Sequence, residues 1–263
     1  MDRIESSQNT RYKGLYKLIT SKAARNQANL IVLDGVHLVQ DYITAYPQSD
    51  IQIFVDETNQ RDEIAALIQK LDASCSITEL SAQLFQKIRV TKTPQGIIAI
   101  APRPKAVVNQ RAGGSAVGLE GLQDPGNLGA ILRSALAFGI KRVYLTRDCV
   151  DPFSPKSLRG GMGAQFRLEI IENVDLSAVI QEFKGRSIAA IVDGGEPLNE
   201  IDLAGDVFFL IGSEGAGLSD VIKESADQLV SIPLGNGVES LNAACAASLF
   251  FFQKQGFNLK SGE

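Results

Sequence analysis

The chain has 263 residues, 44% of them hydrophobic and 21% charged, so it is long enough for two globular domains. Three widely spaced cysteines without a Cys-x-x-Cys pair and a single histidine, His37, argue against a disulfide framework and a zinc or histidine metal cluster. No apolar leader and no run of roughly 18 apolar residues is present, so we expect a cytoplasmic protein that binds neither membrane nor metal.

The net charge of −4 is divided unevenly along the chain. Residues 1–112 carry 14 Lys and Arg against 11 Asp and Glu, whereas residues 113–263 carry 12 against 19. Before Asp34, only Asp2 and Glu5 oppose six cations, which are Arg3, Arg11, Lys13, Lys17, Lys22 and Arg25. Such a basic stretch either binds phosphate or forms an ordinary solvated helix surface.

The N-terminal part alternates between helical and strand patterns. We expect helices at 14–25, 36–45 and 63–71, and strands at 29–33, 51–55 and 96–101. This alternation predicts a small α/β domain. The polar loop at 91–96, which contains one lysine, is consistent with both a ligand contact and a plain turn.

A stretch of low hydrophobicity at 102–115 separates the two halves of the chain. It begins with Pro102 and Pro104 and ends near Gly113 and Gly114, which is typical of a linker. We therefore predict a domain at 1–105, a linker at 106–115 and a second domain at 116–263.

The second half repeats the α/β pattern. Strands are expected at 116–119, 142–145, 187–192, 207–211 and 229–232, with a helix at 128–138 and further helices between most strands. About 150 residues arranged in this way predict a parallel sheet covered by helices.

The last strand leads into a loop and then into a helix rich in alanine, within the segment 230–249. Gly235 and Gly237 interrupt the strand pattern, and Ser240 can cap a helix that opens at Leu241. Such a corner holds small polar ligands in many α/β proteins, although it can also be an ordinary buried corner. A dinucleotide site is disfavoured, because it needs a further strand and an acidic residue about 20 residues later.

Three strand-end loops in a fixed order carry a specific resemblance. They are residues 124–129 with Arg133, residues 211–218, and residues 232–233 followed by 239–242. Together they resemble the three signature motifs of the SpoU/TrmH-type RNA 2'-O-ribose methyltransferases, which are members of the SPOUT superfamily. The similarity covers essentially all of the chain from residue 116 to residue 252.

Two other segments are similar to parts of the same enzymes. Residues 156–166 resemble the segment that lies between the first two motifs in the family. Residues 17–25 and 33–35 resemble, more loosely, the substrate-binding domain that precedes the catalytic domain in many members. Asp34 stands where the family usually has glutamate.

The resemblance implies a fold, a cofactor and partners. It implies a small α/β substrate-binding domain followed by a parallel-sheet α/β domain whose C-terminal segment forms a trefoil knot. It also implies S-adenosylmethionine as the cofactor, a homodimer formed through the catalytic domains, and an RNA substrate, with ribosomal RNA favoured. By position, Gly212, Ile232 and Leu241 would line the cofactor pocket, with the loop after Val192 nearby.

The same resemblance assigns residues to the chemistry. Arg133 occupies the position of the family's catalytic arginine, and we expect it to grip a phosphate and stabilise negative charge on the 2'-oxygen. Asn127, Ser240 and Asn242 are expected to position the nucleotide and the loops, and Glu214 to orient Arg133 or a loop N–H. The alternatives are a transfer RNA methyltransferase and a non-catalytic RNA-binding protein of the same fold.

Overall fold

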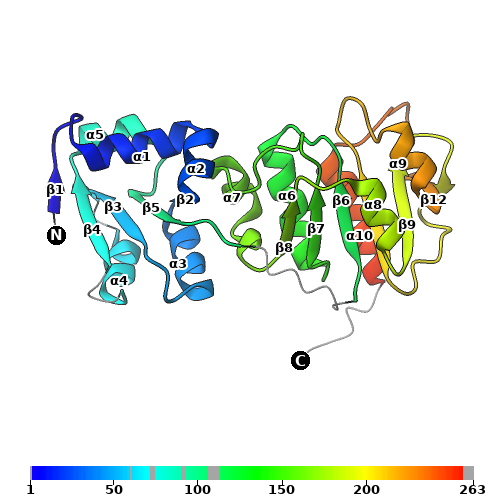
Figure 1. Ribbon diagram of the computed structural model, residues 1–263, viewed down its shortest axis with the longest axis horizontal. Coiled ribbons are helices and arrows are strands. Elements are labelled where there is room, and N and C mark those ends of the chain that lie inside the picture. Colours follow the sequence, from blue (N-terminus) through cyan, green and yellow to red (C-terminus); the bar gives the residue numbers. More distant parts are fainter. Residues whose placement is uncertain (1, 60, 72–74, 90–92, 106–112, 257–263) are drawn as a thin grey trace. The chain divides into compact units, whose positions relative to one another are not determined.

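The computed structural model describes residues 2–59, 61–71, 75–89, 93–105 and 113–256 (Figure 1). The chain divides into two compact units, one formed by residues 1–105 with 153–166 and the other by residues 106–152 with 167–263. Residues 153–166 therefore belong to the first unit, although their neighbours in sequence belong to the second. Most of the expected linker and the lysine of the loop at 91–96 lie outside the described residues.

The first unit contains a five-stranded mixed sheet in the order β1-β4-β3-β5-β2. Strands β1, β4 and β3 are parallel, while β5 is antiparallel to both of its neighbours. The bounds are β1 Asp2–Ile4, β2 Leu30–Asp34, β3 Gln52–Asp56, β4 Ser76–Leu80 and β5 Ile97–Pro102. The three expected strands of this unit are thus present within one residue, and β1 and β4 were not foreseen.

Helices cover this sheet on two sides (Figure 1). They are α1 Thr10–Thr20, α2 Lys22–Ala28, α3 Val36–Ala45, α4 Asp62–Gln69 and α5 Ala82–Ile88. Helix α7 Pro155–Gly161 contacts β2, the strand at one end of the sheet. One core cluster joins residues of α1, α2 and α5 to strand residues such as Val32 and Phe54. Because the side chains of a strand alternate between faces, the neighbours of these strand residues face the opposite side of the sheet.

The single helix expected at 14–25 is wrong, because the chain breaks at Ser21. Ser21 has an extended backbone with φ −126° and ψ 114°, so it ends α1 and begins α2. Its hydroxyl accepts a hydrogen bond from the Ala24 N–H, which a serine at a helix N-cap does readily. Asn29 then ends α2 in the left-handed region, with φ 53°.

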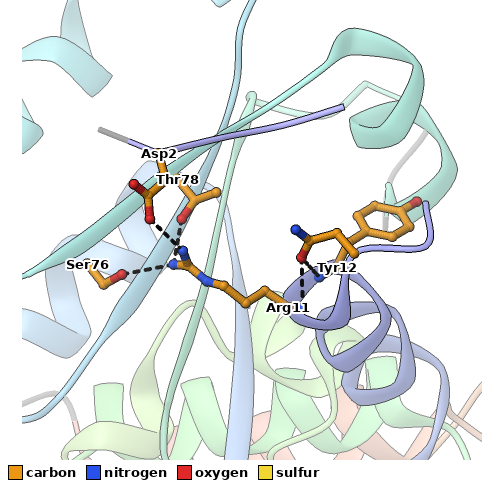
Figure 2. Close-up of polar contacts among 6 residues, drawn as sticks. Asp2, Arg11, Tyr12, Ser76 and Thr78 are labelled. Carbon is orange, nitrogen blue, oxygen red and sulfur yellow. Dashed lines mark hydrogen bonds and ion pairs between the residues drawn. The ribbon is translucent and has the colours of Figure 1, made fainter. Parts of the chain in front are cut away.

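Arg11 ties α1 to two strands (Figure 2). Its guanidinium donates to the Asp2 carboxylate at 2.9 Å, to the Ser76 hydroxyl at 2.9 Å and to the Thr78 hydroxyl at 2.6 Å. Asn9 caps the helix by accepting from the Arg11 N–H at 2.9 Å. Arg11 therefore fastens the short strand β1 and the neighbouring strand β4 to the first helix.

The arginines of the basic N-terminal stretch make contacts within the protein. Arg11 is engaged as above, and Arg3 pairs with Glu57 at 2.7 Å. Arg25 is buried and donates to the Leu18 carbonyl at 2.9 Å. The surface positive charge of this stretch therefore comes mainly from its lysines, such as Lys17 and Lys22, which are exposed.

Replacing Arg11 with alanine should lower the free energy of unfolding by about 1–2 kcal/mol, because the fully buried Thr78 hydroxyl loses this donor. Urea unfolding of the purified protein measures this change. Lys13→Ala is the matched control, since its ammonium makes one exposed hydrogen bond, to Gln8. Equal stability of the two variants would show that the Arg11 contacts contribute nothing.

The second unit contains a seven-stranded sheet in the order β10-β12-β9-β11-β6-β7-β8, and every strand pair in it is parallel. The bounds are β6 Ala116–Leu119, β7 Arg142–Leu145, β8 Glu169–Glu172, β9 Arg186–Ile191, β10 Glu196–Pro197, β11 Val207–Ile211 and β12 Gln228–Ser231. The expected parallel sheet is confirmed, and β6, β7 and β11 have the expected bounds.

Adjacent phenylalanines of β11 show how both faces of this sheet are covered. Phe208 packs against Phe183 and Tyr144, with ring centroids 5.2 and 5.5 Å away, on the side of α8 Leu176–Glu182 and α9 Asp220–Ser225. Phe209 packs instead against Phe251 of α10 Ala243–Gln255, at 5.5 Å. Helix α6 Pro125–Ala137 contacts α10, and the Ser134 and Ser248 hydroxyls lie 2.8 Å apart.

Within the described part of the chain, no helix has the length and apolar character needed to cross a membrane.

Candidate functional site

A cleft of about 1040 Å³ lies in the second unit, at the carboxyl ends of β9, β11 and β12. Val192 follows β9, Gly212 follows β11 and Ile232 follows β12, and all three residues line the cleft. Because the strands are parallel neighbours, their carboxyl ends meet at one edge of the sheet. Open α/β sheets bind ligands in this position.

The four residues expected at the cofactor all line this one cleft, since Leu241 joins the three strand-end residues. Glu214 and Ser240, which were expected to take part in catalysis, also line it. Asn127, Arg133 and Asn242 do not belong to its lining.

Gly212 has no room for a side chain. A Cβ atom built there would lie 2.1 Å from the backbone carbon of Gly217, well inside contact distance. The loop folds back because Ser213 and Gly217 exchange two backbone hydrogen bonds, of 3.2 and 2.9 Å. Gly217 itself has φ +68°, a conformation that favours glycine. The absence of a side chain at Gly212 thus lets the loop close over the strand end.

A short chain of side-chain hydrogen bonds joins the three loops. The Asn127 amide donates to the Glu214 carboxylate, and the Asn242 amide donates to the Asn127 side-chain oxygen at 3.0 Å. Asn242 also accepts from the Ala244 N–H at 2.9 Å with its own side-chain oxygen. These side chains come from α6, from the loop after β11 and from the N-cap of α10, so they hold the edge of the site together.

Two helix starts differ from the expectation. Helix α10 begins at Ala243 and is capped by Asn242, so the prediction of Ser240 as the cap of a helix opening at Leu241 is wrong. Helix α6 begins at Pro125 rather than Leu128, because Asp124 accepts from the Gly126 N–H at 2.7 Å. Proline at the first helical position suits such a start, since its missing N–H would have no partner there.

Replacing Asn242 with alanine should destabilise the start of α10 by about 1 kcal/mol, because a capping acceptor for the first N–H groups is lost. Amide hydrogen exchange at Ala244 and Cys245 measures this opening. Ser240→Ala is the matched control, as its side chain caps no helix in the structure. The same exchange rates in both variants would show that Asn242 does not hold this helix.

Arg133 lies on the exposed side of α6, and its guanidinium makes no hydrogen bond or ion pair with the described residues. The carboxylate of Glu214 accepts a hydrogen bond from Asn127. The role expected for Glu214, which is to orient Arg133 or a loop N–H, stays a prediction. Arg133 is therefore available for an external group, and guanidinium groups bind phosphate well.

The charges around the cleft are mostly negative. Asp193, Glu214 and Glu239 line it, against one cation, Lys223. Sequence reasoning did not single out Asp193, although an acidic residue followed by Gly194 and Gly195 directly after a strand is a signal for a strand-end loop. Among the described residues, no cluster of His, Cys, Asp or Glu side chains could hold a metal ion.

Known proteins match both units. Residues 114–252 match the SpoU rRNA Methylase family, and residues 9–99 match the MRM3-like substrate binding domain. The 23S rRNA (guanosine(2553)-2'-O)-methyltransferase RlmP of Bacillus subtilis is 30% identical over 97% of this chain and 100% of its own length. An uncharacterized tRNA/rRNA methyltransferase of Synechocystis is 33% identical over 95% of this chain and 92% of its own.

A solved structure agrees with these sequence matches. The AdoMet-bound rRNA methyltransferase from Sinorhizobium meliloti has a TM-score of 0.81 and 25% identity, and the match covers 97% of each chain. The family match spans the loops that build the cleft. The chain therefore belongs to the SpoU rRNA methylase family.

Proposed function

We propose that this protein transfers a methyl group from S-adenosylmethionine to a ribose 2'-oxygen of ribosomal RNA. The observation that carries this proposal is the cleft at the ends of β9, β11 and β12, which gathers the expected cofactor residues of a SpoU methylase. The reaction named for the Bacillus relative and the cofactor named for the Sinorhizobium structure support it.

The cleft suits the proposed cofactor. Its volume of about 1040 Å³ is just above the roughly 300–1,000 Å³ usual for small-molecule sites, so it has room for the cofactor. Ile232 and Leu241 offer apolar contacts, while Gly212, Gly215 and Gly217 contribute backbone to the lining. The excess of acidic side chains, including Asp193, favours a ligand with positive charge. When bound, S-adenosylmethionine supplies a methyl group on a sulfonium, whose sulfur leaves as a neutral thioether.

The protein's own residues then have to align the ribose and manage its charge. Arginine is very hard to deprotonate, so Arg133 acts in this proposal as a cation that grips the adjacent phosphate and stabilises negative charge on the 2'-oxygen. Asn127, Glu214 and Asn242 keep the loops in place through their hydrogen bonds. Ser240 lines the cleft and is proposed to position the nucleotide.

The first unit is proposed to bind the RNA. Its match to a substrate-binding domain and its exposed lysines support this role, as does the excess of positive charge in residues 1–112. In this proposal the functional domains are residues 1–105 and 116–263 with a linker at 106–115. Ribosomal RNA as the substrate implies a cytoplasmic protein.

We also propose a homodimer formed through the second unit, in which the C-terminal segment forms a trefoil knot. Helix α10 exposes Leu249 and Phe252, with 43% and 37% of their surfaces accessible. The two residues are three positions apart and so are neighbours on the surface of the helix, where they form an apolar patch. Sedimentation equilibrium should therefore give twice the mass of the chain. A monomer at micromolar concentration would contradict this assembly.

Transfer RNA is the second candidate substrate, because the Synechocystis relative is named a tRNA/rRNA methyltransferase. The deciding experiment is transfer of labelled methyl from S-adenosylmethionine to unmodified total RNA, followed by alkaline hydrolysis. A 2'-O-methyl group blocks cleavage at its own phosphodiester, so label should appear in dinucleotides, and sizing the labelled RNA identifies the substrate. Label in mononucleotides would instead mean base methylation, and no transfer with no cofactor binding would favour a non-catalytic RNA-binding protein.

A further inference from the structure

A second cavity, of about 220 Å³, lies within the first unit and is separate from the cofactor cleft. It is lined by Asp34 at the end of β2, by His37 and Leu38 at the start of α3, and by Arg159 and Met162 at the end of α7. We propose that this cavity binds one unpaired guanine base of the RNA, an inference that rests on the proposed function.

Two opposite charges line the cavity without pairing. Within the described residues, Asp34 and Arg159 form no ion pair, and the Asp34 carboxylate accepts no hydrogen bond. The Nη1 atom of Arg159 is buried and has no hydrogen-bond partner. A buried donor without an acceptor is costly, so a ligand that brings an acceptor to Arg159 and donors to Asp34 is favoured.

Burial raises the pKa of the Asp34 carboxyl, and the positive charge of Arg159 lowers it in part. The carboxylate is therefore held in a place where water stabilises it poorly. N–H donors from a ligand replace that lost hydration.

The walls of the cavity are fixed and partly apolar. Gly35 has φ +103°, and a Cβ atom there would lie 2.5 Å from the Gln95 side-chain oxygen, which accepts from the Val36 N–H at 2.8 Å. Leu38 is buried, whereas Met162 is 47% exposed at the rim. A volume below the roughly 300 Å³ of small-molecule sites suits a flat base rather than a whole nucleotide.

Guanine has the arrangement of groups that the two charges require. Its N1–H and N2–H donors lie side by side and match the two oxygens of a carboxylate, while O6 and N7 accept from an arginine. Adenine and cytosine do not present two adjacent ring-edge donors of this kind. Because the pairing edge has to be free, the base must be unpaired, which is how proteins read most RNA sequence.

The test measures binding of the full-length protein to short single-stranded RNA oligonucleotides that differ only in one central base. The oligonucleotide with a central guanosine should bind about tenfold more tightly than the one with inosine, which lacks the N2 amino group. It should also bind more tightly than the one with adenosine. Asp34→Asn should abolish this preference, whereas Asp50→Asn should keep it, since Asp50 is exposed and outside the cavity. Arg159→Gln serves as a second variant, and it should weaken binding of guanine and inosine alike, because both bases carry O6 and N7.

Equal affinity of the unmodified protein for guanine, inosine and adenine would overturn the inference. So would a guanine preference that survives in folded Asp34→Asn. If that variant fails to fold, unchanged guanine binding by Arg159→Gln overturns it instead. S-adenosylmethionine binding is measured on the same samples. If the unmodified protein does not bind S-adenosylmethionine, the proposed function is refuted. If it binds S-adenosylmethionine but shows no preference for guanine, only the guanine cavity is refuted.

Discussion

Replacing Arg133 with alanine should lower the turnover of methyl transfer by about 10²–10³-fold, while affinity for S-adenosylmethionine stays the same. That loss is the usual cost of removing one group that stabilises developing negative charge. The cofactor is unaffected because Arg133 does not line the cleft. Single-turnover assays with labelled cofactor and saturating RNA measure the rate of the chemical step.

Arg167→Ala is the matched control for this change. Arg167 is also exposed and in the second unit, but it precedes β8 and so lies at the amino edge of the parallel sheet, opposite the cleft. Arg133→Lys separates two roles, because lysine keeps the charge and loses the planar fork. Full activity of the lysine variant would refute bidentate phosphate binding, and full activity of the alanine variant would remove Arg133 from the mechanism.

The buried strands of the second unit could be predicted closely from sequence. β6, β7 and β11 are short apolar or alternating runs bounded by polar and glycine residues, and the structure places them as expected. The pattern works because central strands of a parallel sheet are buried on both faces. β11 is buried along its whole length.

Features decided by single hydrogen bonds could not be predicted in the same way. Ser21, Ser240 and Asn242 are all reasonable cap residues, yet only the packed structure shows that Ser21 breaks a helix and that Asn242 starts one. A helix cap contributes only about 1 kcal/mol, so neighbouring residues that can cap a helix differ little in energy. A sequence pattern therefore does not show which of them is used.

The contacts within the site also depend on tertiary structure. Asn127 lies 87 residues before Glu214 and 115 before Asn242, so no periodicity connects them, and only the order of the three motifs pointed to one site. Residues 153–166 are a stronger case, because their sequence neighbours belong to the other unit. The rings of Tyr42 and Phe166 are in contact, with their centroids 5.4 Å apart. The sequence around either residue does not predict this contact.

Replacing Gly212 with alanine should weaken S-adenosylmethionine binding by about tenfold to a hundredfold. The new methyl group would meet the backbone of Gly217 at 2.1 Å, and backbone cannot rotate away as a flexible side chain can. The loop has to move, at a cost of about 1–3 kcal/mol for overpacking, and its two hydrogen bonds between Ser213 and Gly217 are strained or lost. Because this loop lines the cleft, moving it should lower the affinity for the cofactor.

Gly215→Ala makes the same chemical change in the same loop, at a position where a Cβ atom meets nothing within 4 Å. Calorimetric titration of both variants with S-adenosylmethionine therefore isolates the steric effect from any general loss of glycine flexibility. The Gly215 variant should bind like the unmodified protein. If both variants bind equally well, the close return of the loop over Gly212 does not shape the cofactor site, and the cleft must be held open by the strand ends alone.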